Sequence, residues 1–233
     1  MPMPFYVAPE QLMKDRADFA RKGIARGKPV VAIEYADGIL FIADNPSTHL
    51  YKISEIYDRI AFAAVGKYSE FENLRIAGVR LADVRGYSYG REDVTAKSIA
   101  NAYSQGLANI FSQEMLPYEV ELLVAQVGEG PEDNELFHIL YDGSVTDEDG
   151  FVAMGGESDA LAQRLGSGYQ TGMALADALK LGAASLAAQN GGESSADGEV
   201  TGGRLEVAVL DRNQLRRKFR RVPDDEVDQI LGS

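Results

Sequence analysis

The stretch from Gly27 to Ser47, GKPVVAIEYADGILFIADNPS, constrains the fold more than any other part of the chain. It predicts two strands, Pro29 to Tyr35 and Ile39 to Ala43, joined by a tight turn at Ala36-Asp37-Gly38. The first strand is rich in β-branched residues and the second is an almost unbroken apolar run. Because such runs are typical of strands buried on both faces, we expect this hairpin to lie between two other layers.

Buried hairpins of this kind, with a glycine turn and a following aspartate such as Asp44, also occur in enzymes that use the first residue of the mature chain as nucleophile. Those enzymes carry Thr, Ser or Cys at the head of the first strand. Here that position holds Gly27 and Lys28, and a whole segment precedes it. The hairpin therefore raises the question of what such a strand pair does without a nucleophile.

The remaining segments predict strands and helices in groups rather than in alternation. We expect helices at 9–23, 69–82, 95–114, 158–165, 173–188 and 224–231, and further strands at 51–53, 56–59, 61–65, 119–127, 136–140, 151–154, 205–210 and 217–222. The segment YDGSVTDED is typical of turns, and 189–203 has the composition of a flexible loop. Two helical pairs, each against its own sheet, predict an α+β fold, namely a four-layer α-β-β-α sandwich with an added N-terminal helix. We expect one domain over 9–233, preceded by an arm over 1–8.

The residue composition excludes several kinds of site. The chain has no cysteine, which excludes disulfides, thiolate metal sites and a cysteine nucleophile. Its two histidines, His49 and His138, lack the spacing of zinc ligands, so we expect no metal and no cofactor. No apolar run reaches the length of a membrane span, and the N-terminus lacks the features of a secretory signal. These observations favour a cytoplasmic protein that has no membrane partner.

The charge balance argues against a nucleic-acid partner. The formal net charge is −13, and such a chain repels nucleic acid unless a local basic patch overrides the field. The one candidate patch is RNQLRRKFRR, from Arg212 to Arg221. We interpret it as a late strand whose basic side chains protect a sheet edge from aggregation.

Eight segments, taken in order, carry a resemblance to a known family. They are APEQLMKDRADFARKGIARGK, VVAIEYADGILFIADNPS, YKISEIYDRIAFAAVGKYSEFENLR, ADVRGYSYGREDVT, LPYEVELLVAQV, LYDGS, FVAMGG and LEVAVLDR. None is specific alone, but their order and spacing are. The chain resembles the α subunits of the proteasome core particle, the 20S particle, in their actinobacterial form.

The resemblance answers the question that the hairpin raises. In the catalytic β subunits of this family, the hairpin begins with an N-terminal Thr, and Asp44 lies where those subunits keep an acidic partner. By strand register, Lys28 takes the place of the Thr. A lysine inside a chain offers neither the hydroxyl nor the adjacent free α-amine, so the resemblance implies a subunit that is not itself an enzyme and keeps the segment after Pro9 as a helix.

The resemblance also implies partners and a gate. Family α subunits form a heptameric ring that caps a ring of β subunits, and their N-terminal arms obstruct the entry of unfolded protein substrates. Activators, either ring ATPases or ATP-independent proteins, dock on the outer face and insert their C-terminal tails between neighbouring α subunits. The arm here has no Tyr-Asp-Arg motif, unlike archaeal and eukaryotic arms. It comprises Met1, Pro2, Met3, Pro4, Phe5, Tyr6, Val7 and Ala8.

Four residues follow from the family pattern as parts of the pocket for activator tails. Lys52 lies fourteen residues before Gly66, a spacing that matches the family's pocket lysine and the glycine that ends the next strand. Pro9 matches the proline at the turn that leads from the gate into the first helix. Asp18 matches an acidic residue that faces the pocket of the neighbouring subunit.

Two other classes of function remain as alternatives. One is a self-processing peptidase or amidohydrolase, which would need a cleavable junction before a Thr, Ser or Cys at the strand head. Gly27-Lys28 is no such junction, and Thr48 and Ser54 lie at the wrong positions. The other is a stand-alone ligand-binding domain, which the mass in solution would distinguish from a ring.

Overall fold

The computed structural model describes residues 8–189 and 205–232. The predictions on Met1 to Val7 and on 190–203 therefore lie outside the described residues. The helices are α1 (Pro9–Ile24), α2 (Tyr68–Ser88), α3 (Ala96–Gln113), α4 (Ser158–Gly168), α5 (Leu175–Gln189) and α6 (Asp224–Leu231), with short 3-10 helices η1 (Arg91–Asp93) and η2 (Pro131–Asp133). The strands are β1 (Val30–Tyr35), β2 (Gly38–Asp44), β3 (Ile53–Tyr57), β4 (Ile60–Gly66), β5 (Val120–Gln126), β6 (Glu135–Ile139), β7 (Val145–Asp147), β8 (Phe151–Met154), β9 (Leu205–Asp211) and β10 (Phe219–Arg221).

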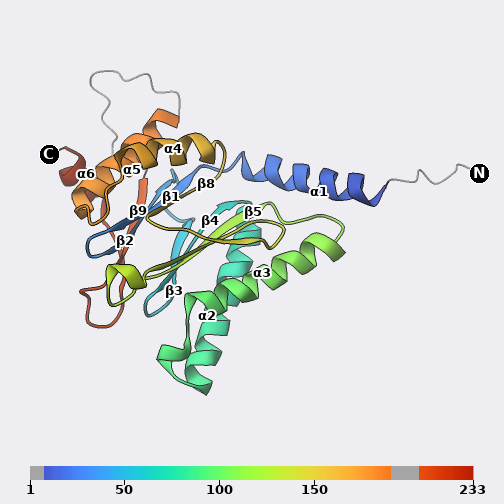
Figure 1. Cartoon of the computed structure of the whole chain (residues 1–233), viewed down its shortest axis with the longest axis horizontal. Helices are drawn as coiled ribbons and strands as arrows, with labels where there is room; N and C mark the ends of the chain where they lie inside the picture. The colour runs from blue at the N-terminus through green and yellow to red at the C-terminus, as the bar shows by residue number, and fades with distance from the viewer. Residues whose placement is uncertain (1–7, 190–204, 233) are drawn as a thin grey trace, which may run out of the picture.

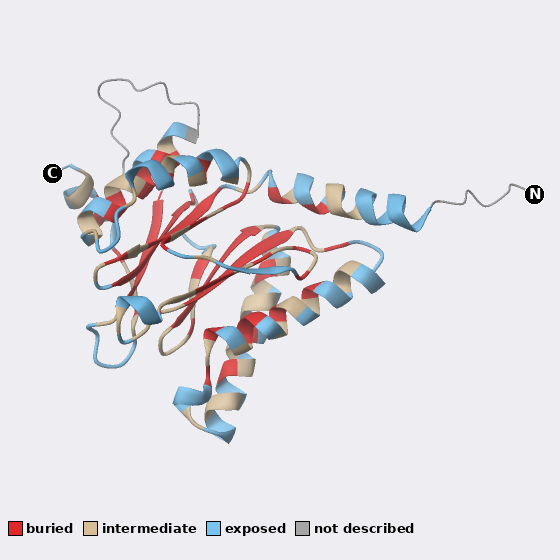
Figure 2. Ribbon diagram, in the orientation of Figure 1, coloured by how far each residue is buried: buried red, intermediate tan, exposed pale blue. Residues whose placement is uncertain are grey.

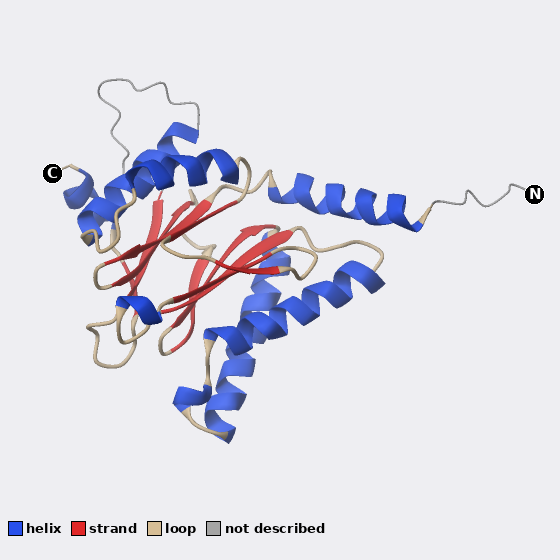
Figure 3. Ribbon diagram, in the orientation of Figure 1, coloured by secondary structure: helices blue, strands red, loops and turns tan. Residues whose placement is uncertain are grey.

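The strands form two five-stranded antiparallel sheets that pack face to face. One sheet has the order β10-β9-β2-β1-β8 and the other β3-β4-β5-β6-β7. Helices α4 and α5 cover the outer face of the first sheet, while α2 and α3 cover the second (Figures 1 and 3). These layers are the predicted α-β-β-α sandwich, so the expected fold class is confirmed.

The apolar core occupies the three spaces between the four layers, which Figure 2 shows as buried strands flanked by half-buried helices. Phe41 and Ala63 belong to the cluster between the sheets. Phe62 and Leu107 belong to the cluster under α2 and α3, and Ile42 to the one under α4 and α5. Every residue of β2 is buried, as its unbroken apolar run predicts.

Four local predictions were wrong. Helix α2 continues six residues beyond the expected end at 82, to Ser88. The predicted strands at 51–53 and 56–59 are one strand, β3. The predicted turn at YDGSVTDED contains β7, a fully exposed edge strand. The basic stretch that begins at Arg212 is mostly a loop, and only its end forms the edge strand β10.

Helix α2 continues because tertiary contacts hold its last turns. A Cβ on Gly86 would lie 2.1 Å from the hydroxyl of Tyr57, so the absence of a side chain lets this part of the helix pack closely against Tyr57 of β3. Within residues 8–189 and 205–232, no helix combines the length and the apolar character that crossing a membrane requires.

Candidate functional site

The head of the β1–β2 hairpin brings Lys28 and Asp44 together. Helix α1 leads through a short turn into β1, and Asp44 is the last residue of β2. The amide of Asp44 donates a hydrogen bond to the carbonyl of Pro29 at 3.2 Å. Nζ of Lys28 lies 3.1 Å from Oδ2 of Asp44, whose carboxylate is almost fully buried. Lys28 thus meets the acidic residue that the resemblance placed beside it.

Lys52 lies at the same end of the sandwich, immediately before β3. Its half-buried side chain donates a hydrogen bond from Nζ to the carbonyl oxygen of Lys28 at 2.6 Å. Burial lowers the pKa of Lys52 to about 8, because loss of water disfavours the charged form. The carboxylates of Asp44 and Glu206 oppose this decrease, and the Lys28 cation adds to it. We refer to Lys28, Asp44, Lys52 and Glu206 as the Lys52 cluster.

Glu206, on β9, holds the segment that carries Lys52 in place. Its carboxylate accepts hydrogen bonds from the backbone amides of Lys52 at 2.8 Å and Ile53 at 3.0 Å. It also accepts one from the side chain of Asn45 at 2.8 Å and one from Arg221 at 2.8 Å. Sequence reasoning missed Glu206. The available signal was a carboxylate within the otherwise apolar run from Leu205 to Leu210.

Arg221 joins the Lys52 cluster to the edge strand β10. Besides its ion pair with Glu206, it donates a hydrogen bond to the carbonyl of Ile53 at 2.6 Å. Its guanidinium lies 3.8 Å from the ring centroid of Tyr51, a stacked cation–π contact. Lys28, Lys52 and Arg221 thus face Asp44 and Glu206, which leaves three cations against two carboxylates. The excess of positive charge suits this end of the sandwich to an incoming carboxylate.

Gly66 lies close to the Lys52 cluster, at a position where both the backbone conformation and the close packing favour glycine. Its φ of 111° is in the region that favours glycine, and an added Cβ would lie 1.9 Å from the carbonyl oxygen of Glu119. A Cβ on Gly27 would in turn approach the amide of Gly66 to 3.0 Å. The adjacent Lys67 is exposed and forms an ion pair with Glu70 at 2.7 Å. Gly66 therefore fits a structural role in the close packing of backbone beside Lys28.

Pro9 and Asp18 lie outside the Lys52 cluster of their own chain. Pro9 begins α1, which extends away from the sandwich so that its N-terminal half lies beyond both sheets (Figure 1). Asp18 is partly exposed and forms an ion pair with Arg21 at 3.7 Å. The predicted contact of Asp18 with the pocket of a neighbouring copy stays a prediction. The same helix exposes Leu12, Met13 and Phe19, apolar side chains that a neighbouring copy could cover.

The histidines and acidic residues do not assemble a metal site in the part of the chain that the structure describes. His49 contacts Thr48 at 2.8 Å on the surface. His138 contacts Glu121 at 2.6 Å, and Glu121 also accepts a hydrogen bond from the amide of Gly155 at 3.0 Å. This second pair links the two sheets through a largely buried carboxylate.

The family profile and the individual relatives that match this chain all point to the same family. The sequence profile of the family described as "Proteasome subunit" matches residues 24–210. The chain is 60% identical to "Proteasome subunit alpha" of Xylanimonas cellulosilytica, over 95% of this chain and 93% of that protein. It is 58% identical to the protein of the same name from Kineococcus radiotolerans, over 95% and 94% of the two chains. With that of Thermomonospora curvata it shares 56% identity over 100% of this chain and 99% of the relative. These matches confirm the resemblance in the sequence, and the chain belongs to the proteasome subunit family.

Proposed function

We propose that this chain is a non-catalytic α subunit of a cytoplasmic 20S proteasome, which forms a heptameric ring with copies of itself and binds a ring of β subunits. The observation that carries the proposal is the Lys28–Asp44 pair at the head of the hairpin, where the chain continues without a break from α1. A nucleophile of the N-terminal type needs a hydroxyl or thiol next to a free α-amine that acts as its base. Lys28 offers neither, since its amine nitrogen lies in a peptide bond.

Peptidase assays on the β-free chain test the non-catalytic role. We expect no turnover of peptide substrates at any pH at which the chain stays folded. Intact-mass measurement should show the full N-terminal block, because the chain has no junction at which to process itself. Turnover that a Thr-directed inhibitor blocks would overturn the proposal in favour of a self-processing hydrolase.

We further propose that Lys52 receives the C-terminal carboxylate of an activator tail inserted between neighbouring copies. Three features support this role. The ammonium is half-buried, its charge is only partly offset by Asp44 and Glu206, and its backbone is fixed by Glu206. A fixed, partly dehydrated cation binds a carboxylate more strongly than an exposed one does. Asp18 and Pro9 of the adjacent copy would form the opposite wall of this pocket.

The variant Lys52→Ala tests the pocket. Removing one partner of a buried charge pair costs about 2–5 kcal/mol per site, so activator binding should fall more than tenfold. Several tails bind one ring, and the loss is therefore amplified through avidity. Basal cleavage of small peptides should not change. The matched control is Lys97→Ala, which removes an exposed lysine on α3. Normal activator binding by Lys52→Ala particles of equal assembly would refute the pocket.

We also propose that Met1 to Ala8 act as the gate. The arm carries two prolines and has no apolar period, and ordering so short a segment costs conformational entropy. The arm should therefore exchange between open and closed conformations, with only a modest preference for the closed one. Deleting Met1 to Val7 should speed the degradation of unfolded proteins by the assembled particle more than that of small peptides. An unchanged rate for unfolded protein, with assembly intact, would count against the gate.

A further inference from the structure

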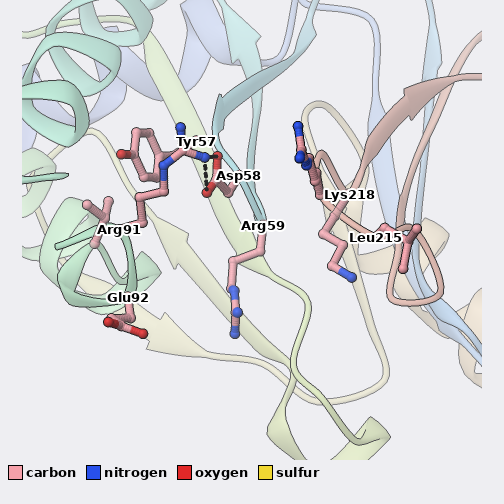
Figure 4. Close-up of a pocket in the computed structure, with 9 residues that line it drawn as sticks. Tyr57, Asp58, Arg59, Arg91, Glu92, Leu215 and Lys218 are labelled. Atoms are coloured by element: carbon pink, nitrogen blue, oxygen red, sulfur yellow. Dashed lines mark hydrogen bonds and ion pairs between the residues drawn. The ribbon is translucent and has the colours of Figure 1, made fainter.

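A second cationic site lies at the end of the sandwich opposite the Lys52 cluster. It is a pocket of about 510 Å³ between the β3–β4 turn, η1 and the β9–β10 loop (Figure 4). Residues Tyr57, Asp58, Arg59, Arg91, Glu92, Val94, Leu215, Arg216 and Lys218 line it. The amide of Lys218 donates a hydrogen bond to the carbonyl of Asp58 at 2.9 Å, which ties the two sheets together at this pocket.

The walls of the pocket carry an excess of positive charge. Four cations and two carboxylates line it, which gives a net charge of +2 in a chain whose net charge is −13. Asp58 is already engaged by Arg91, whose Nη1 lies 3.2 Å from Oδ2. Lys218 is a fixed part of the wall, because its ammonium donates to the carbonyls of Arg212 and Gln214.

Arg59 and Arg216 supply the unused donors. Among the residues that the structure describes, neither guanidinium has a side-chain hydrogen bond or an ion pair. Figure 4 shows Arg59 between the Arg91–Glu92 side of the pocket and the Lys218–Leu215 side. A guanidinium presents a planar fork of N–H donors that matches the oxygens of phosphate groups. Leu215, which is 99% exposed, adds an apolar contact at the rim.

We propose that this pocket binds a small anion that carries two or more phosphate groups. The volume is within the range of small-ligand sites. Several cations from three segments of the chain line the pocket, which suits a multiply charged ligand, whereas a single terminal carboxylate needs only one, as at Lys52. An extended acidic peptide would reach beyond the pocket into the negative field of the chain. The proposal rests on the pocket alone and is independent of the function proposed for Lys52.

Calorimetric titration of the full chain with inorganic tripolyphosphate at low ionic strength tests the proposal. We expect binding by the parent, at least tenfold weaker binding by Arg59→Gln, and a similar loss in Arg216→Gln, which lies in an exposed loop. The control is Arg80→Gln, which removes an exposed guanidinium from α2 and should leave binding unchanged. Adenosine triphosphate in a parallel titration distinguishes the source of the phosphates, since tighter binding than tripolyphosphate would assign part of the ligand to a nucleoside.

Three outcomes would overturn the proposal. The first is that the parent does not bind tripolyphosphate. The second is that the Arg59→Gln and Arg80→Gln variants lose tripolyphosphate affinity equally. The third is that the parent binds a glutamate-rich peptide in preference to tripolyphosphate. Circular dichroism establishes that each variant is folded. If Arg59→Gln does not fold, the comparison of Arg216→Gln with Arg80→Gln decides. Added salt should weaken the binding strongly, because the pocket is open to solvent.

Discussion

Charged side chains lie at both ends of strand β3, but the carboxylates are buried at one end and exposed to solvent at the other. At the Lys52 end, the carboxylates of Asp44 and Glu206 are buried. Asp44 pairs with Lys28, and Glu206 accepts several hydrogen bonds. At the other end, Arg91 and Asp58 form an exposed pair around an open pocket. Buried charges must be paired or the fold loses stability, whereas exposed charges interact weakly and stay available to ligands. We therefore expect the same kind of substitution to have very different effects at the two ends.

The largest expected effect belongs to Glu206→Ala. It leaves the amides of Lys52 and Ile53 and the Arg221 guanidinium without their acceptor. Loss of one partner from such a buried network should lower the free energy of unfolding by about 3–5 kcal/mol. Urea denaturation of the full chain measures this change.

The matched control for Glu206 is Glu55→Ala, on β3 itself. Glu55 pairs with Arg217, and the two side chains are 24% and 69% exposed. A pair that is partly open to solvent contributes about 0–1 kcal/mol, so this variant should lose far less stability than Glu206→Ala. Similar losses for the two glutamates would remove the distinction between the two environments.

Gly66→Ala should give the next largest effect. The residue has a φ of 111°, and its new methyl would lie 1.9 Å from the carbonyl oxygen of Glu119. Backbone must move to relieve that overlap, so we expect a loss of about 3 kcal/mol in urea denaturation. Gly106→Ala in α3 meets nothing within 4 Å and should stabilise the chain by about 0.5–1 kcal/mol. If Gly66→Ala left the free energy of unfolding unchanged, this end of the sandwich would be loosely packed.

Glu206 and Gly66 also show how far the structure can be predicted from the sequence. The hairpin from Pro29 to Ala43 was predicted because its apolar run determines its burial. Asp44 and Lys28 could be placed together because the family resemblance puts them where catalytic β subunits keep an acidic partner beside the Thr. Gly66 was found through the family's spacing between the pocket lysine and the glycine that ends the next strand, but its backbone conformation depends on Glu119, the residue just before β5.

Glu206 was missed because its partners lie far away in the chain. More than 150 residues separate it from Asn45, Lys52 and Ile53. The end of α2 was misplaced for a related reason, since Gly86 looks like a helix breaker until the position of Tyr57 is known. Local patterns thus predicted the layers, and the family resemblance predicted Lys28, Asp44 and Lys52, while Glu206 depends on contacts between distant segments of the chain.

The third prediction concerns pH at the Lys52 end. With a pKa of about 8, the fraction of Lys52 that is charged falls from about 90% at pH 7 to about 10% at pH 9. If the ammonium receives the activator carboxylate, affinity per site should fall about tenfold over this range. Lys52→Arg should bind more weakly at pH 7 but lose most of this pH dependence, because a guanidinium stays charged.

The stability of the chain provides an internal control for that pH effect. The folded-state pKa of Lys52 is below the model-compound value of 10.5, so the unfolded chain binds more protons between about pH 8 and 10.5. The contribution of Lys52 to the free energy of unfolding therefore increases with pH in that window, while activator binding decreases. Binding and stability that decline together would indicate general unfolding instead of titration of Lys52.

The smallest expected effect is that of Asp58→Asn, at the open end. Its pair with Arg91 has side chains that are 41% and 75% exposed, so solvent and salt screen the attraction. The free energy of unfolding should change by no more than about 0.5 kcal/mol, because exposed pairs of this kind contribute little. The backbone carbonyl that accepts from Lys218 is kept, so the link between the loops should survive. The variant also removes a negative charge and releases Arg91, which should strengthen tripolyphosphate binding several-fold at low salt. A loss above about 2 kcal/mol would mean that the open end, too, depends on its charge pairs for stability, and the contrast between the two ends of β3 would fail.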